Sequence, residues 1–164
     1  MNLKQPMIRS KKYTDAARGQ SCVITGTNDG TIVSCHYSGM HSNRLGKGAG
    51  VKAHDIFVAD LKATVHSDLD NYKSGRNYRS AVVFLDAIMA TQRRRESQGL
   101  LFRASGKGLH EELESEHEYT MWGLMLQDLP DEEYREMFEL MMGFFEQQIQ
   151  QVYAGELIVK GMKA

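Results

Sequence analysis

The sequence predicts an α+β fold, in which a small mixed core is followed by a mostly helical C-terminal extension. Short β-prone segments gather in the first 60 of the 164 residues, and apolar residues recur at helical spacing further along. The charge also changes sign near residue 107. We therefore expect a basic core over residues 1–104. An acidic helical extension over residues 105–164 is expected to pack on it or to mediate oligomerisation.

The first elements alternate turns with short β-prone runs. After a loose arm over residues 1–10, a short helix is predicted over 11–19. The runs at 21–25 and 31–37 flank an Asn-Asp-Gly turn, which is a strong β-hairpin signal. This hairpin would place Cys35 near the end of its second strand, on the opposite face from the residue that follows it.

A long glycine-rich loop over residues 38–53 separates the hairpin from the next elements. A brief strand is expected at 55–59, and a helix follows with Asp60 as its N-cap. Within that helix His66 and Asp70 are four residues apart, so they project from one face. The spacing also suits a plain surface ion pair, which contributes only about 0.2–0.5 kcal/mol.

Three further helices are predicted, over residues 77–98, 109–129 and 131–153, and the last ten residues form a short strand or a tail. The helix over 77–98 ends in three arginines, where the helix dipole favours positive charge. The helix over 131–153 carries an apolar stripe that suits a core, the seam of a homodimer or a groove for a partner. The stripe consists of Tyr134, Met137, Phe138, Met141, Met142, Phe145 and Ile149.

The charge is divided between the two parts of the chain. Residues 1–107 hold 17 Lys/Arg against 8 Asp/Glu, a net of +9, and residues 108–164 hold 3 against 13, a net of −10. The basic part suits a polyanion such as nucleic acid, although the two parts could simply attract each other. The sequence shows neither a secretory signal nor an apolar run of membrane-spanning length. We therefore expect a cytoplasmic protein with no membrane partner.

Histidines concentrate between residues 35 and 70, which contain four of the six: His36, His41, His54 and His66. A histidine at a strand end, a loop and a helical His-x-x-x-Asp can hold one divalent metal beside one general base. Hydrolysis of a phosphodiester needs a base for the attacking water and positive charge near the phosphate. The simpler interpretation is that these histidines make ordinary hydrogen bonds, and His41 and His54 are expected to be solvated loop residues.

Residues 13–101 resemble the small HNH-like (ββα-metal) nucleases of lambdoid phages and prophages, the YbcO-like group. The order and spacing of several short motifs carry this resemblance. They are AARGQSC at 16–22, CHY at 35–37, GAGVKAHD at 48–55, the His66/Asp70 pair and Ala-Thr-Gln at 90–92. The resemblance implies that the basic part has a small ββα-metal core.

The resemblance also implies a role for each matching residue. His36 would be the general base, and Asp55, in the place of the middle HNH asparagine, would orient His36 or shape the loop. His66 and Asp70 would bind one divalent ion (Mg²⁺, Mn²⁺ or Zn²⁺). Cys35 is a further candidate ligand, and its soft sulfur would favour zinc.

Members of that group usually carry paired cysteines for a structural zinc, and this chain departs from the pattern. Its two cysteines, Cys22 and Cys35, do not suffice for a four-cysteine zinc site or a disulfide framework. Contacts to nucleic-acid phosphates are expected from basic side chains of the loop and of the helix that ends at residue 98. These are Arg44, Lys47, Lys52, Arg93 and Arg94. Arg93, Arg94 and Arg95 could equally form a solvated helix end.

The sequence therefore predicts a phage-encoded, metal-dependent endonuclease that hydrolyses DNA in the host cytoplasm. The acidic extension would stabilise the core, restrain nonspecific binding or dock a phage or host protein. The alternative is a non-enzymatic phage protein that keeps the HNH-like shape to bind nucleic acid or a host protein.

Overall fold

The computed structural model describes residues 5–71, 77–114 and 129–163. These residues combine helices with two separate two-stranded antiparallel sheets. The predicted α+β class is therefore confirmed. Among the helices described, none is both long enough and apolar enough to cross a bilayer.

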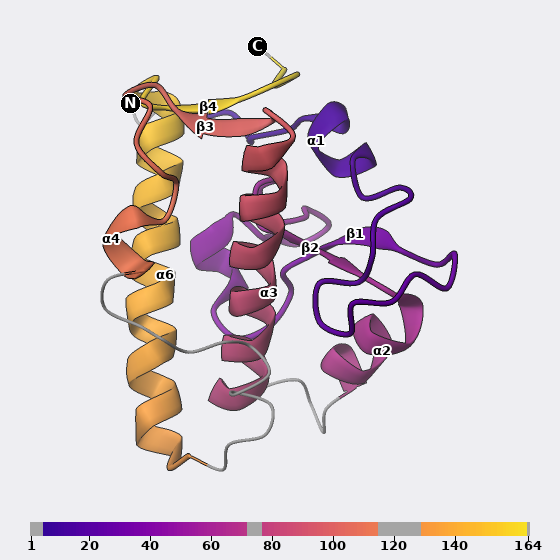
Figure 1. Cartoon of the computed structure of the whole chain (residues 1–164). Coiled ribbons are helices and arrows are strands. Elements are labelled where there is room, and N and C mark those ends of the chain that lie inside the picture. The colour runs from indigo at the N-terminus through magenta and orange to yellow at the C-terminus, as the bar shows by residue number, and fades with distance from the viewer. Residues whose placement is uncertain (1–4, 72–76, 115–128, 164) are drawn as a thin grey trace.

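Two long helices, α3 (Tyr78–Ser97) and α6 (Asp131–Tyr153), lie side by side and run in the same direction (Figure 1). Each leads at its C-terminal end into a short strand, β3 (Leu101–Arg103) after α3 and β4 (Leu157–Val159) after α6. These strands pair antiparallel across the top of the helices in Figure 1. The short helix α4 (Glu111–Glu114) follows β3. The pairing ties the end of the chain to its middle.

The N-terminal elements surround a second small sheet. After α1 (Lys11–Asp15) come β1 (Val33–His36), the 3₁₀ helix η1 (Ser42–Leu45), β2 (Val58–Leu61) and α2 (Ala63–Asn71). β1 and β2 pair antiparallel. α3 packs against β2 on one side and against α6 on another, so it is the central helix of the molecule.

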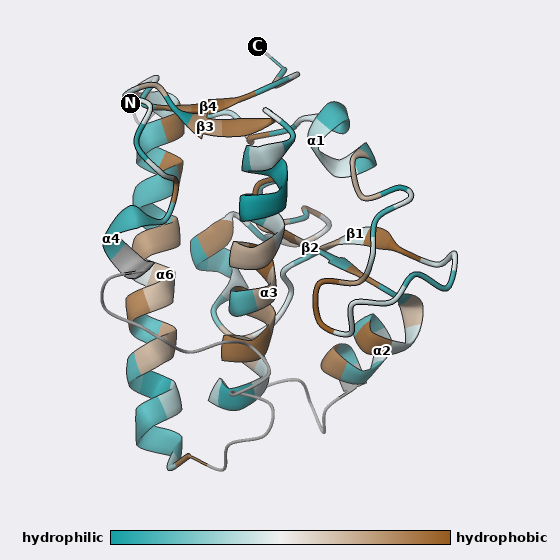
Figure 2. Ribbon diagram, viewed as in Figure 1, coloured by the Kyte–Doolittle hydropathy of each residue, from teal (hydrophilic) through white to brown (hydrophobic). Residues whose placement is uncertain are grey.

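One hydrophobic core joins the elements on both sides of α3. Asn77 caps α3, because its side chain accepts a hydrogen bond from the Ser80 N–H at 2.8 Å. Val82, Leu85 and Ile88 of this helix are fully buried. Each such side chain stabilises the fold by about 1.5–3 kcal/mol. Figure 2 shows β3 and β4 as hydrophobic strands, and the N-terminal half of α6 as mostly hydrophilic on the visible side.

The apolar stripe of α6 is buried within the chain itself. Phe138, Met142 and Phe145 are fully buried, and Met141 is nearly so. This burial agrees with the core interpretation of the stripe, and the homodimer stays a prediction. The core and the β3–β4 sheet both include residues on either side of position 105.

The predicted hairpin over residues 21–37 is wrong, because β1 pairs with β2 instead and residues 23–25 form a turn. The Asn-Asp-Gly segment does turn. The side chains of Asn28 and Asp29 accept hydrogen bonds from the backbone N–H groups two residues further on, at 2.9 and 3.0 Å. Such side-chain bonds offer the backbone an alternative to a two-residue hairpin.

Asp60 is not a helix cap. It lies in β2, which begins three residues later than expected, and its side chain is fully buried against arginines of α3. α2 begins at Ala63, whose N–H donates to the Thr31 hydroxyl at 3.0 Å. The first helix ends at Asp15 rather than Gly19.

The segment over 109–129 is described only in part. The structure shows α4 there, and residues 115–128 of the predicted helix lie outside the described residues. The helices predicted over 77–98 and 131–153 are confirmed to within one residue at each end. The strand β3 was not predicted, whereas the short strand proposed for the last ten residues is present as β4.

Candidate functional site

A histidine–carboxylate pair lies at the C-terminal end of β1. Nε2 of His36, the last residue of the strand, lies 2.8 Å from Oδ1 of Asp55, which precedes β2. Both side chains are partly shielded, with 18% and 10% of their surfaces exposed. A carboxylate only accepts hydrogen bonds, so Nε2 of a neutral His36 must carry the hydrogen and Nδ1 the lone pair. No hydrogen bond reaches Nδ1 from the residues that the structure describes.

Asp55 is held by the segment that precedes α1. Its Oδ2 accepts from the Ser10 N–H at 2.8 Å, and its Oδ1 accepts from Nη1 of Arg9 at 3.1 Å. Burial alone would raise the pKa of Asp55, but the hydrogen bonds from His36 and Ser10 and the charge of Arg9 outweigh it. The pKa of Asp55 is therefore lowered. The carboxylate stays ionised near neutral pH and keeps its acceptor role toward His36.

Arg9 is a site residue that the sequence analysis missed. The first ten residues were expected to form a loose arm, yet Ile8 and Ser10 are fully buried. The arm is ordered because it bonds along the segment before β2, where the backbone N–H of Asp55 donates to the Ile8 carbonyl at 2.9 Å. No local pattern distinguishes this arginine, because its partners lie more than 40 residues away.

His54 is not the solvated loop histidine that was expected. It is 5% exposed, and its Nδ1 accepts a hydrogen bond from the Ile8 N–H at 3.0 Å. Gly46 packs on its other side. A Cβ built there would lie 2.9 Å from Nε2 of His54, and the φ of Gly46 is +97°, so glycine is needed on both grounds. His41 is exposed, and its ring lies 5.8 Å from that of Phe138 on α6.

The two predicted helical ligands lie together on α2. Nε2 of His66 is 3.1 Å from Oδ2 of Asp70, and both side chains are at least one-third exposed. Two donor atoms about 2.1 Å from one ion and at right angles lie about 3 Å apart, so this pair fits a divalent cation in chemistry and spacing. The described residues contain no group of three or more His, Cys, Asp or Glu side chains arranged for a metal. The metal site stays a prediction.

Cys35 is buried, and its thiol is an unfavourable ligand in this state. Burial, followed by the negative charges of Asp70 and Asp60, raises the pKa of Cys35 to about 12. Metals bind the thiolate form, which these surroundings disfavour. Both cysteines of the chain are free thiols.

The predicted phosphate contacts in the loop differ in their surroundings. Arg44 is engaged by α6, since it donates to Glu146 at 2.5 and 3.0 Å and to Glu139 at 3.0 Å. Lys47 is half-buried and Lys52 is exposed. One of the three cationic side chains is therefore already paired with carboxylates of the acidic extension.

The arginines of α3 serve the fold as well. Arg94 donates to Asp60 at 3.0 Å and to the Ser21 carbonyl at 2.7 Å. Arg95 is fully buried, so it is neither available to a phosphate nor part of a solvated helix end. Arg93 is exposed. The basic end of this helix is therefore largely a structural feature, and Arg93 is its most accessible cation.

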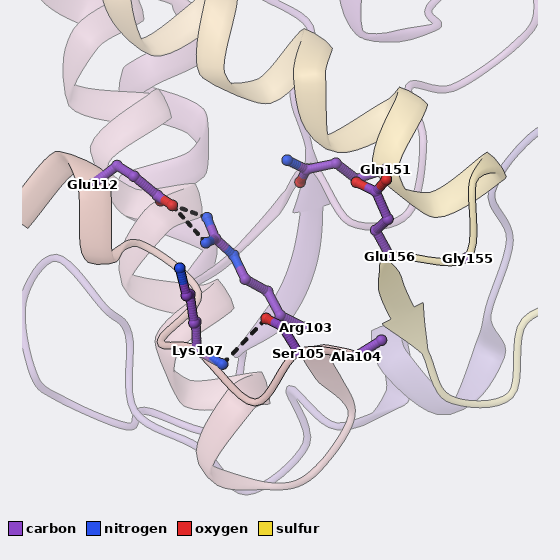
Figure 3. A pocket seen from close by; sticks show the side chains of 8 residues that line it. All are labelled: Arg103, Ala104, Ser105, Lys107, Glu112, Gln151, Gly155 and Glu156. Carbon is purple, nitrogen blue, oxygen red and sulfur yellow. Dashed lines mark hydrogen bonds and ion pairs between the residues drawn. The ribbon is translucent and has the colours of Figure 1, made fainter.

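A pocket of about 350 Å³ lies beside the β3–β4 sheet (Figure 3). Arg103 reaches across it and makes two hydrogen bonds to the carboxylate of Glu112, at 2.5 and 2.6 Å. The pocket is lined by Arg103, Ala104, Ser105, Lys107, Glu112, Gln151, Gly155 and Glu156. It includes none of the predicted catalytic, metal-binding or phosphate-binding residues.

Comparison with known proteins found no matching family model, no similar curated protein and no similar solved structure. Any assignment of function therefore depends on the residues of this chain and on their geometry.

Two buried histidines predict a loss of stability in mild acid. Burial lowers the pKa of His54 to about 4, with a contribution from Arg9, and that of His110 to about 3. An unfolded histidine titrates near 6.5, so below that pH the unfolded chain binds more protons and is favoured. Burial of Asp86 raises its pKa to about 6, so the folded chain gains a proton there as the pH falls from 7 to 5. This gain stabilises the folded chain and offsets part of the loss from the two histidines. We expect a net loss of about 2 kcal/mol between pH 7 and pH 5.

Urea unfolding at several pH values measures this loss. In a His110→Gln variant the decrease between pH 7 and pH 5 should shrink from about 2 to about 0.5 kcal/mol, whatever the absolute stability of the variant, because only His54 then opposes Asp86. The matched control is His41→Gln, at an exposed histidine whose ring contacts Phe138 and no carboxylate among the described residues, and it should keep the wild-type dependence. An unchanged pH dependence in His110→Gln would rule out the explanation.

Proposed function

We propose that this chain is a phage-encoded, metal-dependent endonuclease of the HNH type that hydrolyses phosphodiester bonds in DNA. The observation that carries the proposal is the 2.8 Å contact between His36 and Asp55 at the end of β1. The order β1, β2, α2 and the His66/Asp70 pair on α2 support the same assignment. The resemblance of residues 13–101 to HNH-like nucleases supplies the reaction class.

In the proposed reaction His36 is the general base. Asp55 holds the Nε2–H, which leaves the Nδ1 lone pair to take a proton from water. The water oxygen attacks phosphorus, and the bond between phosphorus and the 3′ oxygen breaks. The imidazolium formed at His36 is stabilised by the adjacent Asp55 carboxylate. A general base of this kind accelerates a reaction by about 10²–10⁴-fold.

His66 and Asp70 are the residues proposed to hold one divalent ion, Mg²⁺, Mn²⁺ or Zn²⁺. When bound, such an ion supplies positive charge for the phosphorane and the leaving oxygen. Cys35 would join them only as a thiolate, which its burial disfavours. Two protein ligands with the remaining positions filled by water are common for Mg²⁺. Cleavage of supercoiled DNA by the purified chain, with each metal and with chelator, tests the proposal.

DNA is proposed to lie along the basic loop that connects β1 and β2. Lys47 and Lys52 would contact phosphates, and Arg93 would extend this surface along α3. Arg94 would make a weaker contribution, because Asp60 already pairs with its guanidinium. Arg44 belongs to the same loop but is held by acidic residues of α6. The proposed site of action is the cytoplasm of the phage host, and a homodimer or a phage or host partner would use the acidic extension.

Removing the two acids that hold Arg44 should strengthen DNA binding. In a Glu139→Gln/Glu146→Gln variant, Arg44 becomes available to a phosphate. We expect the affinity for DNA to rise about threefold to tenfold. The slope of log affinity against log salt concentration should become steeper by about 0.9, the change that one additional phosphate contact causes. Fluorescence anisotropy with a labelled duplex in EDTA measures both quantities in the absence of cleavage.

The matched control for that experiment is Glu132→Gln/Glu136→Gln, on the same helix and with the same change in net charge. Glu132 and Glu136 are exposed and make no ion pair with any residue that the structure describes. Equal gains in affinity for the two double variants would show that only net charge matters and that Arg44 has no special role.

A second candidate function is a non-enzymatic phage protein that binds nucleic acid or a host protein. The observation in its favour is the net charge of +9 over residues 1–107, which suits binding to a polyanion and requires no bound metal. This candidate predicts stable complexes without cleavage in every divalent metal.

A further inference from the structure

We propose that Arg9 is a positioning residue of the candidate active site, and that it acts on His36 through Asp55. This inference rests on the proposed nuclease function for its chemistry. Arg9 lies outside the resemblance to HNH-like nucleases, which begins at residue 13. Its hydrogen bonds, its anchoring and the atom of Asp55 that it contacts give Arg9 this role.

The guanidinium of Arg9 donates to three acceptors, which are the Asp55 carboxylate and two backbone carbonyls shortly before it in the chain. Nη1 donates to Oδ1 of Asp55 at 3.1 Å and to the Ala53 carbonyl at 2.5 Å, and Nη2 donates to the Lys52 carbonyl at 2.7 Å. Arg9 thus contacts both the catalytic carboxylate and the backbone that leads into it. The planar, fork-shaped guanidinium can meet these acceptors together, whereas a lysine ammonium is a single point donor.

The atom that Arg9 contacts is also the atom that holds His36. Oδ1 of Asp55 accepts from Arg9 and from Nε2 of His36, at 3.1 and 2.8 Å. Oδ2 of the same carboxylate accepts from the Ser10 N–H at 2.8 Å. Three donors therefore hold the carboxylate, and any movement of Oδ1 changes its bonds to His36 and to Arg9 together.

Arg9 is itself anchored from two directions. Its carbonyl accepts from the Lys163 N–H at 3.0 Å, and the hydroxyl of the next residue, Ser10, donates to the Lys160 carbonyl at 2.5 Å. On the other side the Ile8 N–H donates to Nδ1 of His54. The C-terminal segment and the residues before β2 thus hold the backbone of Arg9 between them. Such support from neighbouring residues is what a preorganised site requires.

If Arg9 acts through Asp55, its effect should vanish when Asp55 can no longer respond. We expect Arg9→Gln to slow DNA cleavage at saturating substrate by about 10–100-fold, since a small misplacement of a catalytic group has effects of this size. In an Asp55→Ala background, which removes the shared acceptor of Arg9 and His36, the same change should cost less than about twofold. Arg9→Lys should recover only a minor part of the rate, because it restores the charge and not the fork.

A spectroscopic readout follows His36 without metal or DNA. In the wild type, imidazole ¹⁵N shifts should show one tautomer with the hydrogen on Nε2, and Arg9→Gln should convert this to a mixture of tautomers. The control is Arg18→Gln, at an exposed arginine whose ion pair with Asp15 is 3.8 Å long. This variant should leave both the ¹⁵N pattern and the cleavage rate unchanged. Circular dichroism establishes that each variant is folded.

The outcomes separate this inference from the proposed function. Equal losses of rate from Arg9→Gln in the wild-type and Asp55→Ala backgrounds would overturn the positioning role, even in an active nuclease. An unchanged ¹⁵N pattern in folded Arg9→Gln would overturn it as well. Failure of the wild type to cleave DNA in any metal would refute the nuclease function alone. A change of tautomer in Arg9→Gln would still support the link from Arg9 to His36.

Discussion

Replacing His36 by alanine is expected to lower the rate of DNA cleavage by about 10²–10⁴-fold, the usual contribution of a general base. The fold should survive, because the His36 side chain is partly exposed and Asp55 keeps its hydrogen bonds from Arg9 and Ser10. Single-turnover cleavage at a fixed metal concentration measures the chemical step, and thermal unfolding by circular dichroism measures any change in stability.

The matched control for this variant is His41→Ala. His41 lies in the same loop region, is exposed, and makes a ring contact with Phe138 rather than a hydrogen bond to a carboxylate. Its removal should change the cleavage rate by less than about threefold, within the usual range for a residue outside the site. A His36→Ala protein that cleaves at the wild-type rate would refute the assignment of the base.

Replacing Asp60 by alanine is expected to lower the free energy of unfolding by about 3–5 kcal/mol. Arg95 is fully buried, and Nη1 and Nη2 donate to the two carboxylate oxygens of Asp60 at 2.8 and 2.6 Å. Arg94 donates to the same carboxylate at 3.0 Å. Without Asp60 a buried guanidinium loses its anion, and the cost of an unpaired buried charge is large.

Urea unfolding at pH 7 measures the effect of Asp60→Ala. The control is Asp68→Ala on α2, at an exposed aspartate, which should change the free energy of unfolding by less than about 0.5 kcal/mol. A second variant, Asp60→Leu/Arg95→Met, removes both charges and should be more stable than Asp60→Ala. A loss below about 1 kcal/mol for Asp60→Ala would contradict the view that this ion pair holds β2 to α3.

The parts of the fold that the sequence predicted well are governed by local interactions. The periodicity of α3 and α6 agrees with their burial, and their starts coincide with local signals at Asn77 and Pro130. The spacing of His66 and Asp70 on one helical face is likewise local, and the structure shows the two side chains 3.1 Å apart. Such features depend on residues within one or two helical turns.

The features that sequence reasoning missed depend on distant partners. The partner of β1 is β2, beyond a loop of 21 residues from 37 to 57, and the nearer run at 21–25 fits the hairpin signal better. Asp60 looked like a helix cap because its buried partner, Arg95, lies 35 residues away. Arg9 looked like part of a loose arm for the same reason. Tertiary burial overrode local preference at each of these positions.

The two halves of the candidate site were predicted on different grounds: His66 and Asp70 from their helical spacing, and His36 and Asp55 from a family resemblance. His36 and Asp55 are 19 residues apart, and their pairing was suggested by the resemblance to HNH-like nucleases rather than by any periodicity. The structure places the two side chains in contact. The roles of His66, Asp70 and Cys35 as metal ligands stay predictions, because ligation depends on how α2 and the end of β1 face each other around an ion.

Cleavage of circular and branched DNA by the wild-type protein tests the nuclease function most directly. Mg²⁺, Mn²⁺ and Zn²⁺ are each supplied in turn, EDTA is added to a parallel sample, and His36→Ala is run beside the wild type. We expect nicking or linearisation with at least one metal, no cleavage in EDTA, and almost none with His36→Ala. Intact DNA in every metal, or equal cleavage in the presence of EDTA, would contradict a metal-dependent nuclease.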